Sequence, residues 1–198
     1  MNNYDLVKRV LDILVSLISI IILWPIAIII AIVVKVDSKG PVLFSQKRVG
    51  KNGSTFSILK FRTMSVDAPQ NMPTHLLEKP ENCITRSGKI LRKTSLDELP
   101  QVINIIKGEM SFVGPRPALW NQYDLITHRE TYSANSVLPG LTGLAQISGR
   151  DELDLEEKAK LDGIYAKKRS LYYDVEIVVK TFFYVIKSKG VIEGESRS

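Results

Sequence analysis

The chain contains one long stretch without a charged residue, which extends from Ile13 to Val34 and lies between Asp12 and Lys35. A membrane-spanning helix needs ~20 apolar residues, so this stretch is long enough to insert into a bilayer. It is longer than the apolar core of a signal peptide, and no small-residue cleavage motif precedes Lys35. A helix that is apolar on every face could be buried in protein instead, but the remaining chain is small for that. We therefore expect a membrane helix.

Two features leave the path of this helix open. Pro25 lies in the middle of the stretch, where it cannot donate a backbone hydrogen bond and where its ring favours a bend. Basic residues favour the cytoplasmic side of a membrane, and they occur on both sides of the stretch: Lys8, Arg9, Lys35, Lys39, Lys47, Arg48 and Lys51. The residues alone are compatible with a kinked helix that spans the bilayer and with a re-entrant helix whose two ends lie on one side.

The length and charge of the chain restrict its partners. The 198 residues suffice for one domain of ordinary size in addition to the membrane segment. The net charge of +6 suits an anionic partner, which could be a nucleic acid, lipid headgroups or a phosphorylated substrate. The basic residues are not interleaved with an aromatic stacking surface, so we expect no nucleic-acid partner. Cys83 is the only cysteine, which excludes an internal disulfide and agrees with a reducing compartment.

Local patterns predict an α+β fold that is predominantly α. Two short strands, 42–48 and 55–61, are predicted to be joined by a turn at 50–53. The polar, proline-containing segment 67–82 is predicted to be a flexible loop, and 87–107 is predicted to be helical.

An amphipathic helix is predicted near the C-terminus. Its apolar residues recur with the spacing of one helix face: Leu171, Tyr172, Val175, Val178, Val179, Phe182, Phe183 and Ile186. The opposite side carries Asp174, Lys180 and Lys187. Packing of the apolar face on the core is the commoner use of such a helix and is our expectation, and docking in the membrane interface is the alternative. The helix is expected to end at Gly190.

The most informative segment for chemistry is RKTSLDELPQVINIIKGEMSFVGPRPAL, in which Asp97 and Glu98 precede Pro100 at a predicted helix start. Spacing alone favours helix capping, either by Asp97 or by a capping box between Ser95 and Glu98. The same position suits phosphate chemistry, because a helix N-terminus presents free N–H groups and the positive end of its dipole to an anion. An ionised aspartate there could attack phosphorus or supply oxygen ligands to Mg²⁺.

Basic side chains that could neutralise a diphosphate accompany this segment and two loops that contain glycine. The loops are SFVGPRP and LPGLTGLAQISGR, whose glycines could let backbone N–H groups approach a phosphate, although turns are their ordinary use. Taken alone, each basic residue is more typical of a solvated surface. Their association with the loops makes five of them candidates for substrate binding: Lys60, Arg62, Arg92, Arg116 and Arg150.

Five segments together resemble the bacterial sugar transferase family of polyprenol phosphate phosphoglycosyl transferases. They are KRVLDILVS, FSQKRVG, LKFRTM, GKILRKTSLDELPQVINIIKGEMSFVGPRP and LPGLTGLAQISGR, and they occur in the family's order. The resemblance extends from about Lys8 to about Lys187 and includes the apolar stretch. It is closest to the small monotopic members, to which no larger domain is appended.

The resemblance implies a division of the chain into three parts. Residues 1–36 would form a re-entrant membrane helix bent at Pro25, where Trp24 takes the place of the serine usual in the family. Residues 37–190 would form a small cytoplasmic catalytic domain with a short β element and amphipathic interfacial helices. Residues 191–198 would form a polar tail.

The resemblance also implies a reaction. Asp97 would be the nucleophile, Glu98 its partner, and both would take part in binding Mg²⁺. A UDP-sugar would give its sugar 1-phosphate to polyprenol phosphate through a covalent phosphosugar-aspartate, with release of UMP, and so start the synthesis of bacterial glycoconjugates. Phosphate or nucleotide contacts would come from the basic residues that match the family: Lys60, Arg62, Arg116 and Arg150.

A protein of this kind would lie in the bacterial cytoplasmic (inner) membrane, in contact with membrane lipids and with its catalytic domain on the cytoplasmic face. Assembly into a homo-oligomer is left open. Two other functions stay open at this point. One is a membrane-associated diphosphate hydrolase that uses Asp97 and Glu98 with water as the acceptor. The other is a non-catalytic, basic, membrane-anchored binding protein.

Overall fold

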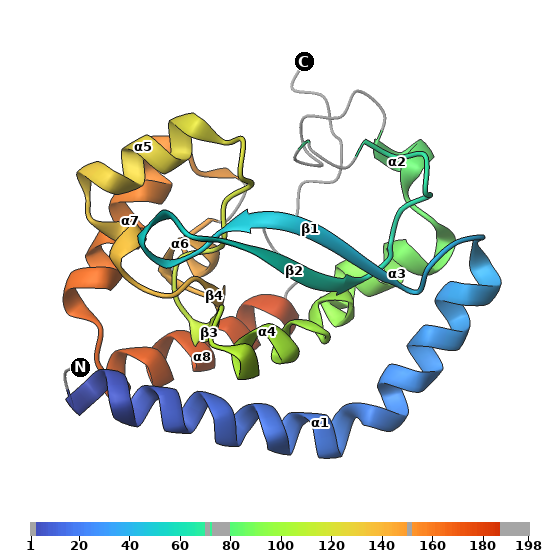
Figure 1. Cartoon of the computed structure of the whole chain (residues 1–198), viewed down its shortest axis with the longest axis horizontal. Coiled ribbons are helices and arrows are strands. Elements are labelled where there is room, and N and C mark those ends of the chain that lie inside the picture. Colours follow the sequence, from blue (N-terminus) through green and yellow to red (C-terminus); the bar gives the residue numbers. More distant parts are fainter. Residues whose placement is uncertain (1–2, 70–71, 73–79, 150–151, 187–198) are drawn as a thin grey trace.

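A computed structural model of the protein describes residues 3–69, 72, 80–149 and 152–186. Helices predominate in this part of the chain, and the two small sheets have two strands each (Figure 1). The predicted α+β, mostly helical fold is thus confirmed. The elements are α1 (Asn3–Asp37), β1 (Leu43–Val49), η1 (Lys51–Gly53), β2 (Thr55–Phe61), α2 (Pro80–Cys83), α3 (Arg86–Thr94), η3 (Leu96–Glu98), α4 (Gln101–Lys107), β3 (Ser111–Val113), α5 (Tyr123–Thr131), η4 (Ala134–Ser136), β4 (Gly140–Thr142), α6 (Leu144–Ile147), α7 (Leu155–Lys168) and α8 (Leu171–Ile186).

The antiparallel pair of β1 and β2 forms at the predicted position. Asn104 on α4 covers the edge of β2 that does not pair with β1. Its Nδ2 donates to the Ser57 carbonyl at 2.8 Å, and its Oδ1 accepts from the Leu59 N–H at 3.0 Å. The fully buried Asn104 side chain thus satisfies backbone groups of β2 that a third strand would otherwise pair with. These bonds also fix α4 against β2.

The glycines of the two loops serve backbone packing between β3 and β4, which pair in parallel. A Cβ atom on Gly140 would lie 2.1 Å from the Gly114 nitrogen, and one on Gly143 would lie 2.1 Å from the Gly114 carbonyl oxygen. Only residues without a side chain allow this approach. Gly114, Gly140 and Gly143 thus have a structural role, because their close packing joins the loop of Arg116 to the loop that contains β4.

The predicted helical segment 87–107 is interrupted. Ser95 adopts a left-handed conformation with φ 57° and ends α3, and a 3₁₀ turn follows before α4 begins at Gln101. A residue other than glycine costs ~1 kcal/mol or more in this conformation. Because of this interruption, Asp97 and Glu98 lie between the two helices, and both are buried.

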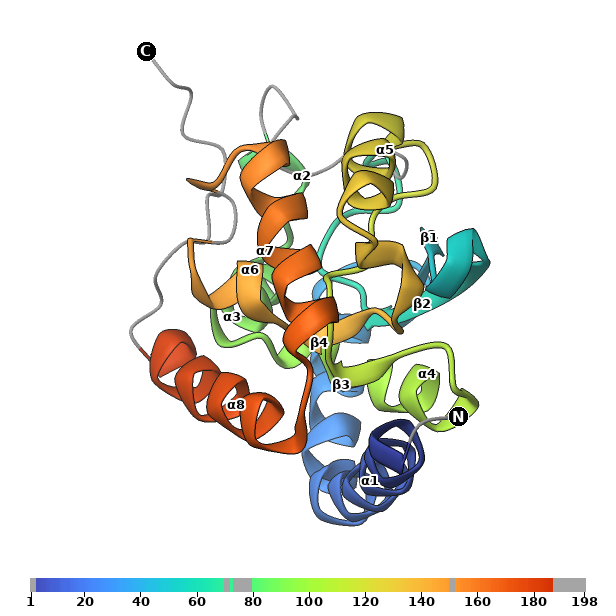
Figure 2. The same ribbon diagram turned by 90° about the vertical axis from the view of Figure 1, so that its left-hand side faces the viewer.

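Helix α1 fits a membrane anchor, since it is the one helix of the described residues that is long and apolar enough to cross a bilayer. Most of its apolar side chains are exposed, among them Ile21, Ile22 and Trp24. The ribbon changes direction along its length (Figure 1). Figure 2 shows that α1 and α8 lie along the same edge of the molecule.

Both ends of α1 are attached to the rest of the chain. Near the N-terminus, the Arg9 guanidinium donates to the carbonyls of Ile105 at 2.5 Å and Ile106 at 2.7 Å in the last turn of α4. At the other end, the Asp37 carboxylate accepts from both the backbone N–H and the hydroxyl of Ser87 on α3, each at 2.8 Å. The exposed apolar middle of α1 is thus flanked by two polar attachments to one body.

The Asp174 carboxylate joins α8 to α1 and α7. It accepts hydrogen bonds from Tyr4 at 2.9 Å, Lys8 at 2.8 Å and Tyr165 at 2.8 Å. Asp174 is buried, so these donors replace the water that its carboxylate would otherwise bind.

The expectation that the apolar face of α8 packs on the core is wrong. The side that carries Asp174 and Ile177 is buried, whereas the apolar residues of the opposite face are exposed: Leu171, Tyr172, Val175, Val178, Val179, Phe182 and Phe183. The reason is that the buried network of Asp174 turns its side of the helix inward. The exposed face lies next to α1 and suits a membrane interface. The expected helix end at Gly190, the tail 191–198 and most of the loop 67–82 lie outside the described residues.

Candidate active site

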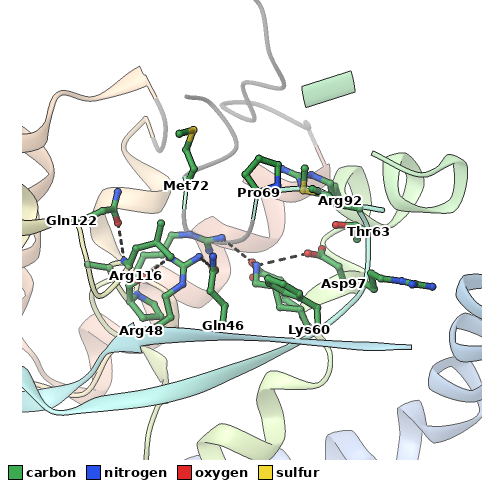
Figure 3. A pocket seen from close by; sticks show the side chains of 18 of the residues that line it. Gln46, Arg48, Lys60, Thr63, Pro69, Met72, Arg92, Asp97, Arg116 and Gln122 are labelled. Carbon is green, nitrogen blue, oxygen red and sulfur yellow. Dashed lines mark hydrogen bonds and ion pairs between the residues drawn. The ribbon is translucent and has the colours of Figure 1, made fainter. Parts of the chain in front are cut away.

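A cavity of about 330 Å³ is lined by residues of the β1–β2 sheet and by residues of α5, α6 and α7. Figure 3 shows the side chains that line it, with Lys60 and Asp97 pointing toward each other. The structure brings six of the seven candidate site residues to this cavity: Lys60, Arg62, Arg92, Asp97, Glu98 and Arg116. Arg150, the seventh, lies outside the described residues.

The turn η3 carries the two adjacent carboxylates. The capping role that spacing favoured is wrong, because neither Ser95 before η3 nor Pro100 before α4 provides a side-chain cap. Asp97 and Glu98 are instead both buried at the cavity. Burial of two neighbouring carboxylates is costly unless cations accompany them, so the arrangement indicates a functional site.

Glu98 is the neutralised member of this pair. Its Oε1 accepts from the Lys60 Nζ at 2.6 Å and from the Arg116 Nη2 at 2.9 Å. Burial alone would raise the pKa of Glu98, but Arg116 and Lys60 outweigh it and hold that pKa well below its usual range. These contacts favour the ionised form of Glu98, which holds two cations at the cavity.

Asp97 is the member with the weaker contacts. Its carboxylate lies 3.7 Å from the Lys60 Nζ, and it accepts no hydrogen bond from any of the described residues. Burial raises its pKa, and the charge of Glu98 adds to this, although Lys60 opposes both effects. An ionised carboxylate that is neither hydrogen-bonded nor well solvated is a reactive nucleophile and a good ligand for a hard cation.

The remaining candidate cations differ in what they contact. Burial lowers the pKa of Lys60, although Glu98 and Asp97 counteract this. Arg62 lines the cavity, but its guanidinium donates to the carbonyls of Ser38, at 2.8 Å, and Lys39, just after α1. The contacts of Arg62 thus attach β2 to the end of the membrane helix. Arg92 lines the cavity beside Asp97 in Figure 3.

Sequence reasoning missed several residues of the cavity, among them Arg48, Gln46, Gln122, Gln146 and the buried ion pair of Arg129 with Asp162. The closest signal was the alternation of β1, which places Lys47 and Arg48 on opposite faces. Alternation alone does not predict which face of the strand lines the cavity.

The donors of the cavity fit a magnesium ion in part. Among the described residues, no three side chains of His, Cys, Asp or Glu form a cluster that could hold a metal. Mg²⁺ needs no such cluster where substrate phosphates and one or two carboxylates complete its shell. The free carboxylate of Asp97, supported by Glu98, is the ligand that the described residues provide.

The described residues thus combine a helix that fits a membrane anchor with a cavity in which basic side chains accompany two buried carboxylates. The family model for bacterial sugar transferases matches residues 3–188, and the chain belongs to this family. The resemblance noted from the motifs is thereby confirmed.

Three named relatives are similar to this chain over most of its length. The galactosyl transferase CpsE of Streptococcus agalactiae is 41% identical over 95% of this chain, which spans 44% of CpsE. A UDP-glucose:undecaprenyl-phosphate glucose-1-phosphate transferase of Klebsiella pneumoniae is 39% identical over 92% of the chain, which spans 41% of that protein. The exopolysaccharide production protein ExoY of Sinorhizobium fredii is 36% identical over 92% of the chain, which spans 87% of ExoY. The chain thus spans less than half of the first two relatives.

Proposed function

We propose that this protein transfers a sugar 1-phosphate from a UDP-sugar to polyprenol phosphate and thereby starts the synthesis of a bacterial polysaccharide or other glycoconjugate. The observation that carries the proposal is the unequal pair in the cavity, in which Glu98 accepts hydrogen bonds from two cations while Asp97 has only a longer ion pair with Lys60, at 3.7 Å. The names of the relatives supply the substrate class, because they include transferases of glucose 1-phosphate from UDP-glucose to undecaprenyl phosphate.

In the first step, an Asp97 carboxylate oxygen attacks the phosphorus that carries the sugar. A bond forms between this oxygen and phosphorus, and the bond from phosphorus to the bridging oxygen of the diphosphate breaks. The electron pair leaves with UMP, so no proton is needed. Lys60, which lies between Asp97 and Glu98, neutralises charge on the reacting phosphoryl group.

In the second step, an oxygen of polyprenol phosphate attacks the same phosphorus. The bond from phosphorus to Asp97 breaks, which restores the carboxylate and leaves a polyprenol diphosphate sugar. Glu98 keeps its charge through both steps and holds Lys60 and Arg116 in position. A magnesium ion bound at Asp97 and the diphosphate would supply further neutralisation of the phosphate charge.

The acceptor explains the position of the site. Its polyprenyl chain is apolar, and the exposed apolar residues of α1 and α8 form the surface that would meet the bilayer. We propose that α1 is re-entrant and turns at Pro25, because Arg9 near one end and Asp37 at the other bind the same body. The catalytic domain would then lie on the cytoplasmic face of the inner membrane, where UDP-sugars are made.

The proposal is tested by measuring UMP release from UDP-glucose and UDP-galactose with and without undecaprenyl phosphate in detergent or nanodiscs. We expect sustained UMP release that requires the lipid, together with a lipid-linked sugar product. Equal release without lipid would indicate a hydrolase. No release from a panel of UDP-sugars, with the protein folded, would indicate a binding protein.

The pH dependence of the transfer should report the state of Asp97. The attack needs the ionised form, and burial raises the pKa of Asp97 above the ordinary value of 3.8. Activity is therefore expected to fall as the pH falls through this raised pKa. Lys60 lowers the pKa of Asp97, so Lys60→Gln should move the acid limb of the kcat/KM profile to higher pH.

Exposed Lys89 on α3 provides the control, and Lys89→Gln should leave the acid limb in place. An acid limb that stays in place or moves to lower pH in Lys60→Gln would contradict the assignment of this limb to Asp97.

A further inference from the structure

Arg48 on β1 is a further arginine of the cavity, and its charge has no carboxylate partner within ion-pair distance among the described residues. Its Nη1 donates to the Pro117 carbonyl at 3.0 Å, and its Nη2 donates to the Gln46 Oε1 at 2.5 Å. Its Nε–H is buried and has no partner. Neutral groups thus hold the guanidinium in place while its charge and one of its donors stay unsatisfied.

The neighbour of Arg48 increases this imbalance. Arg116 carries the same charge, and Figure 3 shows the two side chains close together. Burial and, to a smaller extent, the charge of Arg116 lower the pKa of Arg48 to about 9, although the charge of Glu98 opposes them in part. Glu98 already accepts from Lys60 and Arg116. An anion with several oxygen atoms would reduce the repulsion between Arg48 and Arg116, because it could accept hydrogen bonds from both guanidinium groups.

The position of Arg48 relative to Asp97 identifies the anion. Figure 3 shows Arg48 and Arg116 on one side of Lys60 and Asp97 on the other. In a displacement at phosphorus, the attacking and leaving oxygens are roughly in line. If Asp97 attacks and Lys60 accompanies the reacting phosphoryl group, the leaving phosphate lies on the side away from Asp97. That is the side of Arg48.

We propose that Arg48 binds the phosphate that departs with the nucleoside, an assignment that rests on the proposed function. As the bond from phosphorus to the bridging oxygen breaks, the electron pair moves onto this departing phosphate, and the fixed charge of Arg48 stabilises it. Gln46 and Pro117 hold the Arg48 guanidinium in place, so that its remaining N–H groups can donate to the phosphate oxygens.

The test measures binding of UMP and of uridine to the full-length protein by calorimetry, because the two ligands differ only in the phosphate. The wild type should bind UMP more tightly than uridine. Arg48→Gln should reduce this preference at least about tenfold and leave the affinity for uridine unchanged. Arg48→Lys, which keeps the charge without the fork, should give an intermediate preference.

Lys47→Gln is the matched control, since it removes the same charge from the adjacent position of β1. Lys47 is exposed and lies 5.7 Å from the Trp120 ring on the other face, so its loss should leave the UMP preference intact. An unchanged preference in Arg48→Gln would overturn the Arg48 assignment alone. Absence of UMP binding by the wild type would overturn the proposed function as well. If Arg48→Gln does not fold, Arg48→Lys decides, and a preference equal to that of the wild type overturns the assignment.

Discussion

Asp97→Asn is expected to reduce transfer by at least about 10³-fold while the protein stays folded and membrane-bound. The amide has nearly the shape of the carboxylate but no charge with which to attack phosphorus. Burial raises the pKa of Asp97, which means that folding disfavours its ionised form. The uncharged asparagine avoids this cost, so the melting temperature should be unchanged or higher. The measurements are UMP release, lipid-linked product and thermal unfolding.

A loss of activity without a loss of stability separates a chemical role from a structural one. Asp124→Asn removes an exposed carboxylate on α5 and should leave both activity and stability unchanged. In wild-type protein given UDP-sugar without acceptor, intact-mass analysis should show a phosphosugar adduct that Asp97→Asn lacks. Transfer at the wild-type rate by Asp97→Asn would refute the assignment of the nucleophile.

Cysteines placed at both ends of α1 are expected to stay unlabelled when intact cells are treated with a thiol reagent that does not cross membranes. Asn3 and Lys39 are suitable positions because both are exposed, and Cys83→Ser provides a background without other thiols. The contacts of Arg9 with α4 and of Asp37 with α3 attach both ends to one body, which favours the same side of the bilayer. After permeabilisation, both cysteines should react.

A cysteine at exposed Lys89 on α3 reports the side on which the catalytic domain lies. The re-entrant arrangement requires that the cysteines at positions 3, 39 and 89 behave alike. Labelling of position 3 from outside, with positions 39 and 89 protected, would show that α1 spans the membrane. Pro25→Ala restores the missing backbone donor and should increase external labelling of position 3 if the proline causes the turn.

Local patterns were sufficient for most of the secondary structure. The strands predicted at 42–48 and 55–61 and the helix predicted from the uncharged stretch depend on neighbours in sequence, and the structure has them at 43–49, 55–61 and 3–37. The buried face of α8 was not, because it depends on where Asp174 meets Tyr4, Lys8 and Tyr165. Hydrophobic periodicity finds a helix, but long-range polar contacts decide which of its sides is buried.

The sequence identified the residues of the candidate site, but it did not predict which of them contact one another. The motifs singled out Asp97 and Glu98 as a pair, and nothing in their order says that Glu98 accepts hydrogen bonds from two cations while Asp97 has only a 3.7 Å ion pair with Lys60. Spacing favoured capping because a carboxylate before Pro100 has that role in many helices. The left-handed Ser95, which turns the pair inward, has no clear sequence signal, since serine rarely adopts this conformation.

The two attachments of α1 would fix the distance of Asp97 from the bilayer surface in the proposed arrangement. Arg9 binds the last carbonyls of α4 and Asp37 binds the first turn of α3, and the turn with Asp97 connects these two helices. The depth at which α1 settles in the bilayer therefore determines the level at which Asp97 stands. In the proposed reaction, an acceptor phosphate at the headgroup level would reach Asp97 by lateral movement within its own leaflet, and its hydrocarbon tail would stay in the membrane.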